Sequence, residues 1–169
     1  ASKLAGELYG RAFSASMGLE FVAMRFFNIF GPRQDPASPY AAVVPIFIRC
    51  LRTGKAPTIY GDGEQTRDFT YVTNVAEALL LAAKAPSGKA NGRIFNTACG
   101  GKTSLNTVYE TLQRLAGKRL PAVYQAARQG DVRHSQADIS AARDALGWEP
   151  RIVLEEGLKL TLAASEATA

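Results

Sequence analysis

Apolar residues recur every three to four positions between Ser2 and Met17, and Gly18 follows directly. This spacing predicts an amphipathic helix that ends at the glycine, because glycine readily adopts the left-handed conformation of a helix C-terminus. The residues from Leu19 to Phe30 are almost all aliphatic or aromatic, which is typical of a strand covered on both faces. The pattern therefore predicts a helix followed by a strand of a parallel sheet.

The same two patterns alternate along the rest of the chain. Further helices are expected at residues 43–51, 75–85, 105–115, 138–146 and 154–164. Further strands are expected at residues 58–60, 67–72, 93–98 and 121–124. Thr73 or Asn74 is expected to cap the helix at 75–85, and Ser104 the helix at 105–115. A rigid bend is expected at residues 36–40, and a surface loop at 86–92. Strands that alternate with helices predict an α/β fold.

The apolar run that begins at Leu19 ends with Asn28 and a Gly31-Pro32 break. In open α/β sheets, ligands bind beyond the carboxyl ends of the strands. Asn28 is therefore expected to lie at the mouth of a ligand cleft.

The 169 residues are 47% hydrophobic and 21% charged, which predicts one globular domain or a compact pair of subdomains. The formal charge is +5, but the basic residues are scattered along the sequence. This distribution argues against a nucleic-acid partner. It is compatible with an anionic small ligand, or with no charged ligand at all.

Cys50 and Cys99 lie far apart, and His134 is the single histidine. The spacing fits neither a metal site nor a redox motif, so we expect no metal and a reducing compartment. The sequence also contains no apolar run long enough to span a bilayer and no leader pattern. These features predict a soluble protein of the cytoplasm with no membrane partner.

Polar residues at loop positions are the candidates for chemistry, and each has a structural alternative. Asn28 could cap its own turn, Arg67 could pair with Asp68 at the surface, and Arg128 could pair with Asp131 in solvent. Taken together, two arginines and an amide form a plausible pyrophosphate clamp, because guanidinium groups bind phosphate oxygens in a bidentate way. No glycine-rich phosphate loop precedes a helix, and no Ser-His-Asp or Cys-His arrangement is present.

Four motifs in order resemble a known family: Ser2-Lys3, residues 25–36, residues 61–72 and residues 130–139. Over nearly its whole length, the chain resembles the C-terminal half of extended short-chain dehydrogenases/reductases. Within them it is most similar to the NAD-dependent epimerase/dehydratase family and its UDP-glucose and UDP-N-acetylglucosamine 4-epimerases. The resemblance implies the C-terminal part of a Rossmann-type doubly wound parallel sheet and a smaller α/β substrate-binding subdomain.

The resemblance also implies a division of the chain. Residues 1–30 and 72–98 would be a remnant of the NAD-binding domain, and residues 31–71 and 99–169 would bind the nucleotide sugar. The family's catalytic tyrosine stands four residues before the position of Lys3. We therefore expect that the N-terminal half of the family is missing, and that the chain alone is inactive.

The implied cofactor is NAD, and the implied activity is epimerisation at C4 of a UDP-hexose or UDP-N-acetylhexosamine through a 4-keto intermediate. By resemblance, Lys3 binds the nicotinamide ribose and lowers the pKa of the tyrosine, and Phe27 lies beside the nicotinamide. A solvated surface lysine is the alternative for Lys3. Two alternatives remain for the function: a 4,6-dehydratase or decarboxylase of the same fold, or a non-catalytic nucleotide-sugar-binding fragment.

The family's substrate site implies further roles for residues of this sequence. Asn28 would bind the sugar diphosphate, Arg67 and Arg128 the diphosphate, and Asp131 the ribose hydroxyls. The residues expected beside the nucleotide are Ala42, Val43, Thr58, Ile59 and Tyr60, of which the last three would contact the uracil. Ala42 departs from epimerases that have an asparagine at that position.

Ser135 corresponds to a position that lines the hexose pocket, where a large aromatic residue would exclude a 2-acetamido group. The serine leaves space for that group, although it could instead cap a helix near Asp138. The resemblance further implies a homodimer that forms through the helix at residues 2–17.

Overall fold

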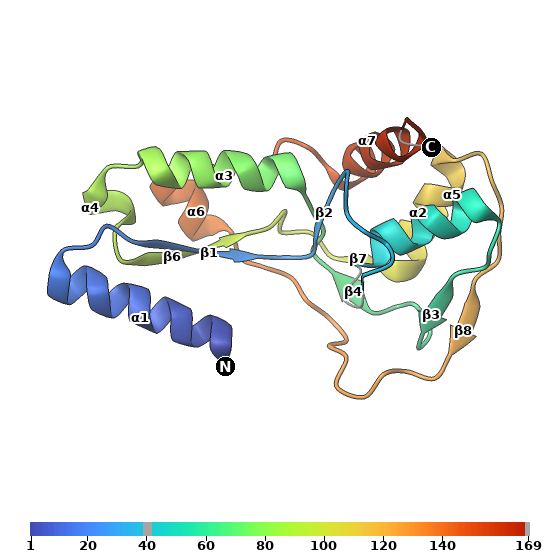
Figure 1. Ribbon diagram of the computed structural model, residues 1–169, viewed down its shortest axis with the longest axis horizontal. Helices are drawn as coiled ribbons and strands as arrows, with labels where there is room; N and C mark the ends of the chain where they lie inside the picture. The colour runs from blue at the N-terminus through green and yellow to red at the C-terminus, as the bar shows by residue number, and fades with distance from the viewer. Residues whose placement is uncertain (39–41, 168–169) are drawn as a thin grey trace.

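The computed structural model describes residues 1–38 and 42–167 of an elongated molecule (Figure 1). Its helices are α1 (Ser2–Met17), α2 (Val43–Thr53), α3 (Val72–Lys84), α4 (Ser87–Ala90), α5 (Leu105–Leu115), α6 (Ser140–Leu146) and α7 (Leu154–Glu166). Its strands are β1 (Val22–Phe26), β2 (Ile29–Phe30), β3 (Thr58–Tyr60), β4 (Thr66–Arg67), β5 (Thr70–Tyr71), β6 (Arg93–Thr97), β7 (Thr103–Ser104) and β8 (Val123–Gln125). Part of the bend expected at residues 36–40 lies outside the described residues.

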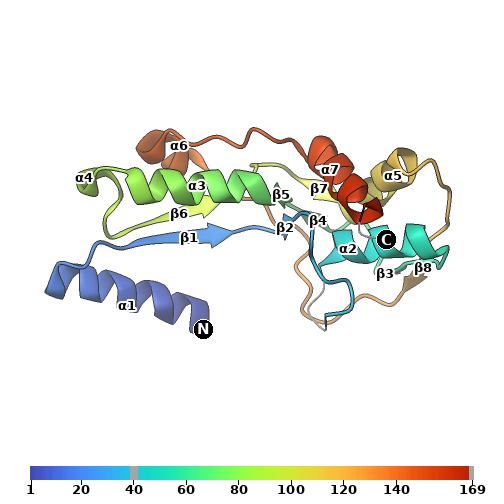
Figure 2. The same ribbon diagram turned by 45° about the horizontal axis from the view of Figure 1, so that its top comes forward.

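One end of the molecule is built on the parallel pair β1 and β6, with Val22 opposite Arg93 and Phe26 opposite Thr97. Helices α3 and α6 lie on one face of this pair and α1 lies on the other (Figures 1 and 2). The core between the pair and α3 and α6 contains the fully buried Phe95. It is closed by Trp148, which follows α6.

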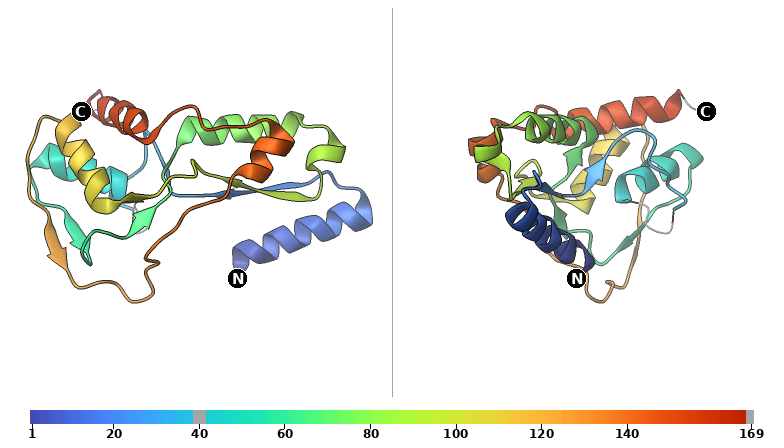
Figure 3. Two further views of the ribbon diagram at one scale, coloured as in Figure 1. Left: turned by 180° about the vertical axis from the view of Figure 1, so that it is seen from behind. Right: turned by 60° about the vertical axis from the view of Figure 1, so that its left-hand side comes forward.

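The other end packs α2, α5 and α7 around the short strands β2 and β5 (Figure 3, left). Phe30 is buried here with Phe47, Tyr109 and Leu158. Pairs β2–β5 and β3–β8 are parallel, and β4–β7 is antiparallel. The parallel pairs and the alternation of strands with helices confirm the predicted α/β class.

The prediction that residues 19–30 form one strand covered on both faces is wrong. Strand β1 ends at Phe26, which is 48% exposed, and the chain bends at Asn28 before β2. Val22 and Met24 pack against the core below α3 and α6, whereas Arg25 is exposed and pairs with Glu7 of α1 at 2.6 Å. The reason is that α1, which has no buried residue, covers its face of the sheet only loosely.

Several element boundaries also differ from the prediction. Helix α3 begins at Val72, so neither Thr73 nor Asn74 caps it, and α4 lies inside the expected loop at 86–92. The Asn74 side chain is buried and accepts hydrogen bonds from the backbone N–H groups of Arg151 and Ile152, both at 3.0 Å. It therefore fixes the segment that leads into α7 instead of capping the start of its own helix.

The Ser104 cap on α5 is confirmed, because the Thr107 N–H donates to Ser104 Oγ at 3.2 Å.

A long connection, residues 126–139, runs from β8 at one end of the molecule back to α6 at the other (Figure 1). It carries Arg128, Asp131 and Ser135. Among the described residues, no helix is long and apolar enough to cross a membrane.

Candidate functional site

Two adjoining clefts contain most of the residues that the sequence singled out. The first, of about 230 Å³, is lined by Asn28, Ala42, Arg67 and other residues. We call it the amide cleft. The second, of about 390 Å³, is lined by Thr58, Ile59, Tyr60, Arg128, Asp131 and other residues. We call it the aromatic cleft. Val43 and Leu105 line both, so the two clefts meet along the start of α2 and the start of α5.

Asn28 is held rigidly at the edge of the amide cleft. Its backbone has a φ of 35°, a left-handed conformation that asparagine tolerates better than most residues. Its side-chain Nδ2 donates to the Asp68 carbonyl oxygen at 3.0 Å, and its own carbonyl oxygen accepts from Thr70 N at 3.3 Å. Asn28 therefore does not cap its own turn, but bridges to a segment forty residues away.

Arg67 lines the amide cleft and forms an ion pair with Asp131, which lines the aromatic cleft. Its Nη2 lies 2.5 Å from Asp131 Oδ1, and its Nη1 donates to the Thr66 carbonyl oxygen at 2.8 Å. The Arg67 side chain is 17% exposed and that of Asp131 is 40% exposed. The alternative in which Arg67 pairs with Asp68 is wrong, because Asp68 is fully buried and accepts from the backbone N–H groups of Cys99 and Ala137.

Arg128 lies over the face of the Tyr60 ring, with Cζ 3.9 Å from the ring centroid. This is a cation–π contact, and it places a second guanidinium group along the aromatic cleft. Asp131 pairs with Arg67, so Arg128 and Asp131 do not form the solvated pair considered above. The two clefts thus join two guanidinium groups, a carboxylate, an amide and an aromatic ring, which can bind an anion next to a flat polar ring system.

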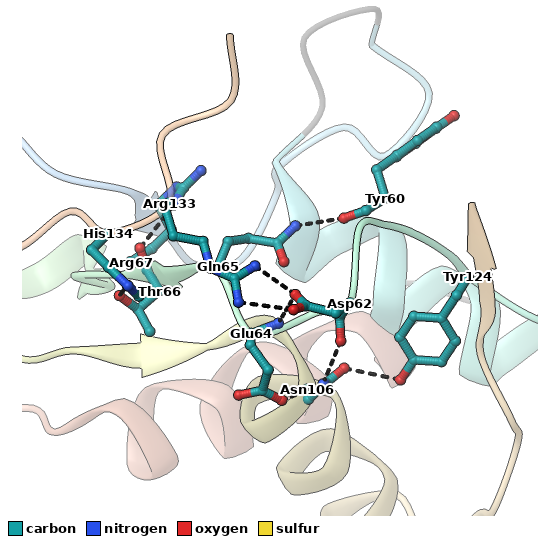
Figure 4. A network of polar contacts seen from close by, with 10 residues as sticks. All are labelled: Tyr60, Asp62, Glu64, Gln65, Thr66, Arg67, Asn106, Tyr124, Arg133 and His134. Atoms are coloured by element: carbon teal, nitrogen blue, oxygen red, sulfur yellow. Dashed lines mark hydrogen bonds and ion pairs between the residues drawn. The ribbon is translucent and has the colours of Figure 1, made fainter. Parts of the chain in front are cut away.

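A polar network attaches the 126–139 connection to the body of the protein (Figure 4). Arg133 donates to both carboxylate oxygens of Asp62, at 2.6 and 2.8 Å. This bidentate contact is the main reason that the pKa of the Asp62 carboxyl lies well below its usual value. Beside it, His134 Nδ1 lies 2.9 Å from Thr66 Oγ1. His134 thus contacts a neighbouring strand and lines neither cleft.

Lys3 and Phe27 lie outside both clefts, in the part of the molecule that contains α1 and β1. Helix α1 runs antiparallel to β1, because Glu7 contacts Arg25 and Gly10 packs against Phe21. The first turn of α1 therefore points towards the end of β1 where Phe27 lies. An exposed ammonium group and a half-buried ring fit the nicotinamide ribose end of NAD. Among residues 1–38 and 42–167, no glycine-rich strand-to-helix turn is present for the pyrophosphate of NAD.

Ser135 is partly buried at the side of β4, where its N–H donates to the Thr66 carbonyl oxygen at 3.1 Å. It lines neither the amide cleft nor the aromatic cleft. The N-cap residue of α6 is Ile139, and the Ser140 N–H donates to Asp138 Oδ1 at 2.8 Å. The Ser135 hydroxyl therefore has no role in starting α6.

Leu105 and Gln65 are among the cleft residues that were not singled out from the sequence. Leu105 lines both clefts, but in the sequence it is one more apolar residue of a helix stripe. Gln65 is buried in the aromatic cleft, donates to the Tyr60 carbonyl oxygen at 2.7 Å, and leaves its Oε1 without a partner. A lone glutamine between two predicted strands carries no signal that it will be buried, so only the folded arrangement reveals it.

Comparisons with known proteins show the family of this chain. Residues 1–98 match the model of the NAD dependent epimerase/dehydratase family. The chain is 39% identical over 158 residues to a putative UDP-glucose 4-epimerase of Methanocaldococcus jannaschii, covering 94% of this chain and 50% of that protein.

Two solved structures superpose closely on the chain. A UDP-glucose 4-epimerase of Thermotoga maritima with UDP-glucose matches with a TM-score of 0.92 and 39% identity, over 98% of this chain and 52% of that one. A UDP-N-acetylglucosamine 4-epimerase of Methanobrevibacter ruminantium, in complex with UDP-N-acetylmuramic acid, matches with a TM-score of 0.92 and 40% identity over the same shares.

The chain spans about half the length of the relatives it matches. Those relatives are UDP-sugar 4-epimerases, and their Rossmann-type fold agrees with the α/β arrangement described above. The matched family depends on NAD. More than half of the chain fits the family model, and we conclude that this protein belongs to the NAD dependent epimerase/dehydratase family.

Proposed function

We propose that this chain is the nucleotide-sugar-binding part of an NAD-dependent UDP-hexose 4-epimerase. The observation that carries the proposal is the junction of the two clefts at Val43 and Leu105, bridged by the Arg67–Asp131 ion pair. A ligand with a flat base at one end, a diphosphate in the middle and a sugar at the other end needs such a continuous site.

In this proposal, the uracil lies in the aromatic cleft against Tyr60, with backbone groups of Thr58 and Ile59 available to its polar edge. Arg67 and Arg128 bind the diphosphate, because guanidinium groups match pairs of phosphate oxygens. The Asn28 amide contributes a further donor at the sugar end. The start of α2, at Ala42 and Val43, packs beside the nucleotide.

Binding exchanges ion pairs within the site. Without ligand, Arg67 and Asp131 neutralise each other at 2.5 Å. A diphosphate competes for the Arg67 guanidinium, and the released Asp131 carboxylate accepts hydrogen bonds from the ribose hydroxyls. Arg67 keeps its second bond to the Thr66 carbonyl oxygen, which limits how far the guanidinium has to move.

Lys3 and Phe27 are the residues of this chain that would hold NAD. When bound, NAD supplies the hydride acceptor and donor for the chemistry at the sugar C4. The Lys3 ammonium would donate a hydrogen bond to a nicotinamide ribose hydroxyl, and its charge favours the anionic form of a neighbouring phenol. Phe27 would shield the site from water on one side.

The experiment uses the full-length protein that contains this chain. The protein is incubated with NAD and UDP-glucose or UDP-N-acetylglucosamine, and proton NMR follows the appearance of the C4 epimer. We expect interconversion of the two epimers at constant total sugar. Release of water or carbon dioxide would instead indicate a dehydratase or decarboxylase, and binding without any turnover would indicate a nucleotide-sugar-binding protein.

Three further expectations concern the state of the protein: its assembly, its location and its division into subdomains. The homodimer implied by the resemblance would form through α1, whose exposed residues include Leu8, Tyr9 and Phe13. A position in the cytoplasm and the division into two subdomains stay predictions.

A further inference from the structure

We propose that the Asp62–Arg133 pair is a positioning device that sets the affinity of the site for nucleotide diphosphates. The inference rests on the proposed function, because it concerns the loop that carries Arg128 and Asp131. Neither Asp62 nor Arg133 lines the amide cleft or the aromatic cleft, so the pair would act through the loop and not by touching the ligand.

The loop needs an anchor because residues 123–134 are all exposed. Within it, the Asp131 N–H donates to the Arg128 carbonyl oxygen at 3.2 Å, so these two residues move together as one turn. Gly130 has a φ of 80°, which permits that turn. The orientation of both site residues therefore depends on how the ends of the turn are held.

The first attachment is to β4, which pairs with β7 and also bonds to residues 133–135 of the connection. Thr66 N donates to the Arg133 carbonyl oxygen at 2.9 Å, and Ser135 N donates to the Thr66 carbonyl oxygen at 3.1 Å. The Thr66–His134 contact adds a side-chain contact at 2.9 Å (Figure 4). These bonds fix the backbone after residue 132, but they do not fix the direction of the preceding turn.

The second attachment is the bidentate contact of the Arg133 guanidinium with the Asp62 carboxylate. The Asp62 carboxylate is itself held in place by its neighbours. Asp62 Oδ1 also accepts from the Glu64 N–H at 2.9 Å, so the carboxylate is oriented before Arg133 arrives. The turn that carries Asp62 is fastened to α5, because Asn106 Nδ2 donates to the Asp62 carbonyl oxygen at 3.0 Å and to Glu64 Oε1 at 2.6 Å. Tyr124 of β8 donates to Asn106 Oδ1 at 3.0 Å (Figure 4).

The pair thus connects an oriented carboxylate on the body to a guanidinium two residues after Asp131. Breaking it leaves the turn held by the backbone bonds to β4, by the Arg67–Asp131 pair and by the contact of Arg128 with Tyr60. Without the anchor at Asp62, we expect the turn to sample orientations in which Arg128 and Asp131 do not face the clefts together. Affinity falls by the fraction of time spent in those orientations. Because both side chains are more than half exposed, we expect a modest effect.

The test uses Asp62→Asn and Arg133→Gln in the protein that contains this chain. Asparagine still accepts the Glu64 N–H, so Asp62→Asn removes the bidentate contact with Arg133 while keeping the local turn. Arg143→Gln is the matched control, because Arg143 forms a similarly exposed pair with Glu149 at 2.7 Å on α6. Calorimetry measures the dissociation constant for UDP, and hydrogen exchange followed by mass spectrometry reports on residues 126–136.

We expect each of the two substitutions to raise the UDP dissociation constant about threefold to fivefold. The double variant should be no weaker than the weaker single variant, because both remove one contact. Arg133→Lys keeps the charge but not the bidentate contact, so its UDP dissociation constant should lie between those of the wild type and Arg133→Gln. Exchange in 126–136 should quicken in the Asp62 and Arg133 variants and stay unchanged in the control. The turnover number with UDP-glucose should change less than twofold.

Unchanged UDP affinity in both single variants, or additive losses in the double variant, would overturn the positioning role. Unchanged exchange in residues 126–136 would do the same, even if affinity fell. A wild-type protein that binds no UDP would overturn the proposed function and this inference together. The two failures are therefore distinguishable by the wild-type titration.

Discussion

Asn28 combines a backbone constraint with a side-chain role at a single residue. Its φ of 35° bends the chain between β1 and β2, and its amide reaches the Asp68 carbonyl oxygen. The sequence placed Asn28 at a strand end because a Gly-Pro break follows it. The left-handed conformation was not predicted, because asparagine occurs in strand ends and in turns alike.

Comparing Asn28→Ala with Asn28→Gly separates the two roles. Both variants lose the amide, and both should lose the same affinity for UDP. Alanine also has to adopt a positive φ, which glycine does without steric cost, so Asn28→Ala should be less stable than Asn28→Gly by about 1 kcal/mol. Chemical denaturation of the two variants measures this difference. Equal stabilities would show that the bend relaxes, and unequal UDP affinities would show that the bend itself shapes the cleft.

Ser135 tests the proposed choice of sugar at the residue scale. Ser135 lines neither cleft, but its N–H is bonded to the Thr66 carbonyl oxygen, next to Arg67 of the amide cleft, and the resemblance places it in the hexose pocket. Ser135→Tyr should lower kcat/KM for UDP-N-acetylglucosamine about tenfold or more relative to UDP-glucose, through lost space for the acetamido group. Ser135→Ala is the control and should keep the wild-type ratio. An unchanged ratio in the tyrosine variant would remove Ser135 from the hexose pocket.

At the scale of elements, the helices were more predictable than the strands. Helices α1, α2, α5 and α7 follow long apolar periodicities that end near glycine or a cap, and the structure places them within a few residues of the prediction. Strands β2, β4 and β5 have two residues each, which is too short for a period to be recognised. Helix α3 begins three residues early, at Val72, directly after the buried Tyr71 of β5.

Helix α7 shows how tightly one element can approach another. Gly157 faces the core, where an added Cβ would lie 2.8 Å from Phe30 Cζ and 2.9 Å from Tyr71 Cδ2. Such contacts are too short for a buried aromatic pair to accommodate without movement. The sequence alone gave no reason for a glycine in the middle of this helix.

Gly157→Ala and Gly6→Ala form a matched pair of helix substitutions. The overpacking at Gly157 costs about 1–3 kcal/mol and exceeds the helix-propensity gain of about 1 kcal/mol, so the variant should be less stable. Gly6 of α1 has no atom within 4 Å of an added Cβ, so Gly6→Ala should be neutral or stabilising by up to about 1 kcal/mol. The free energy of unfolding in denaturant measures both. A stable Gly157→Ala variant would mean that α7 can shift away from β2 and β5.

At the scale of the whole molecule, the distant loops converge as the sequence suggested, but by contacts that it did not predict. Arg67 and Arg128 lie along adjoining clefts, and each has a partner in the absence of ligand: Asp131 for Arg67 and the Tyr60 ring for Arg128. Residue types and loop positions indicated a phosphate clamp. The pairing depends on the path of residues 126–139 across the molecule, which no local pattern encodes.

The expected homodimer would form through exposed apolar residues of α1. Tyr9, Phe13 and Met17 lie four residues apart on one row of the helix and are 69%, 44% and 74% exposed. The double variant Tyr9→Glu and Phe13→Glu should convert a dimer of the protein to a monomer, as measured by light scattering, because charge is costly in a buried apolar contact. Val153→Glu, at another exposed apolar residue, should leave the mass unchanged. A dimer that persists in the double variant would place the interface elsewhere.

The central claim is that Arg67 and Arg128, from two remote loops, bind one diphosphate. Calorimetric titration of UDP into the protein that contains this chain tests it most directly, with Arg67→Gln, Arg128→Gln and the surface control Arg143→Gln. Each of the first two substitutions should weaken UDP binding about tenfold or more, because each removes a charge-assisted contact to phosphate, and the control should bind as the wild type does. If UDP binds the wild type and either cleft variant with equal affinity, the two arginines do not share one ligand.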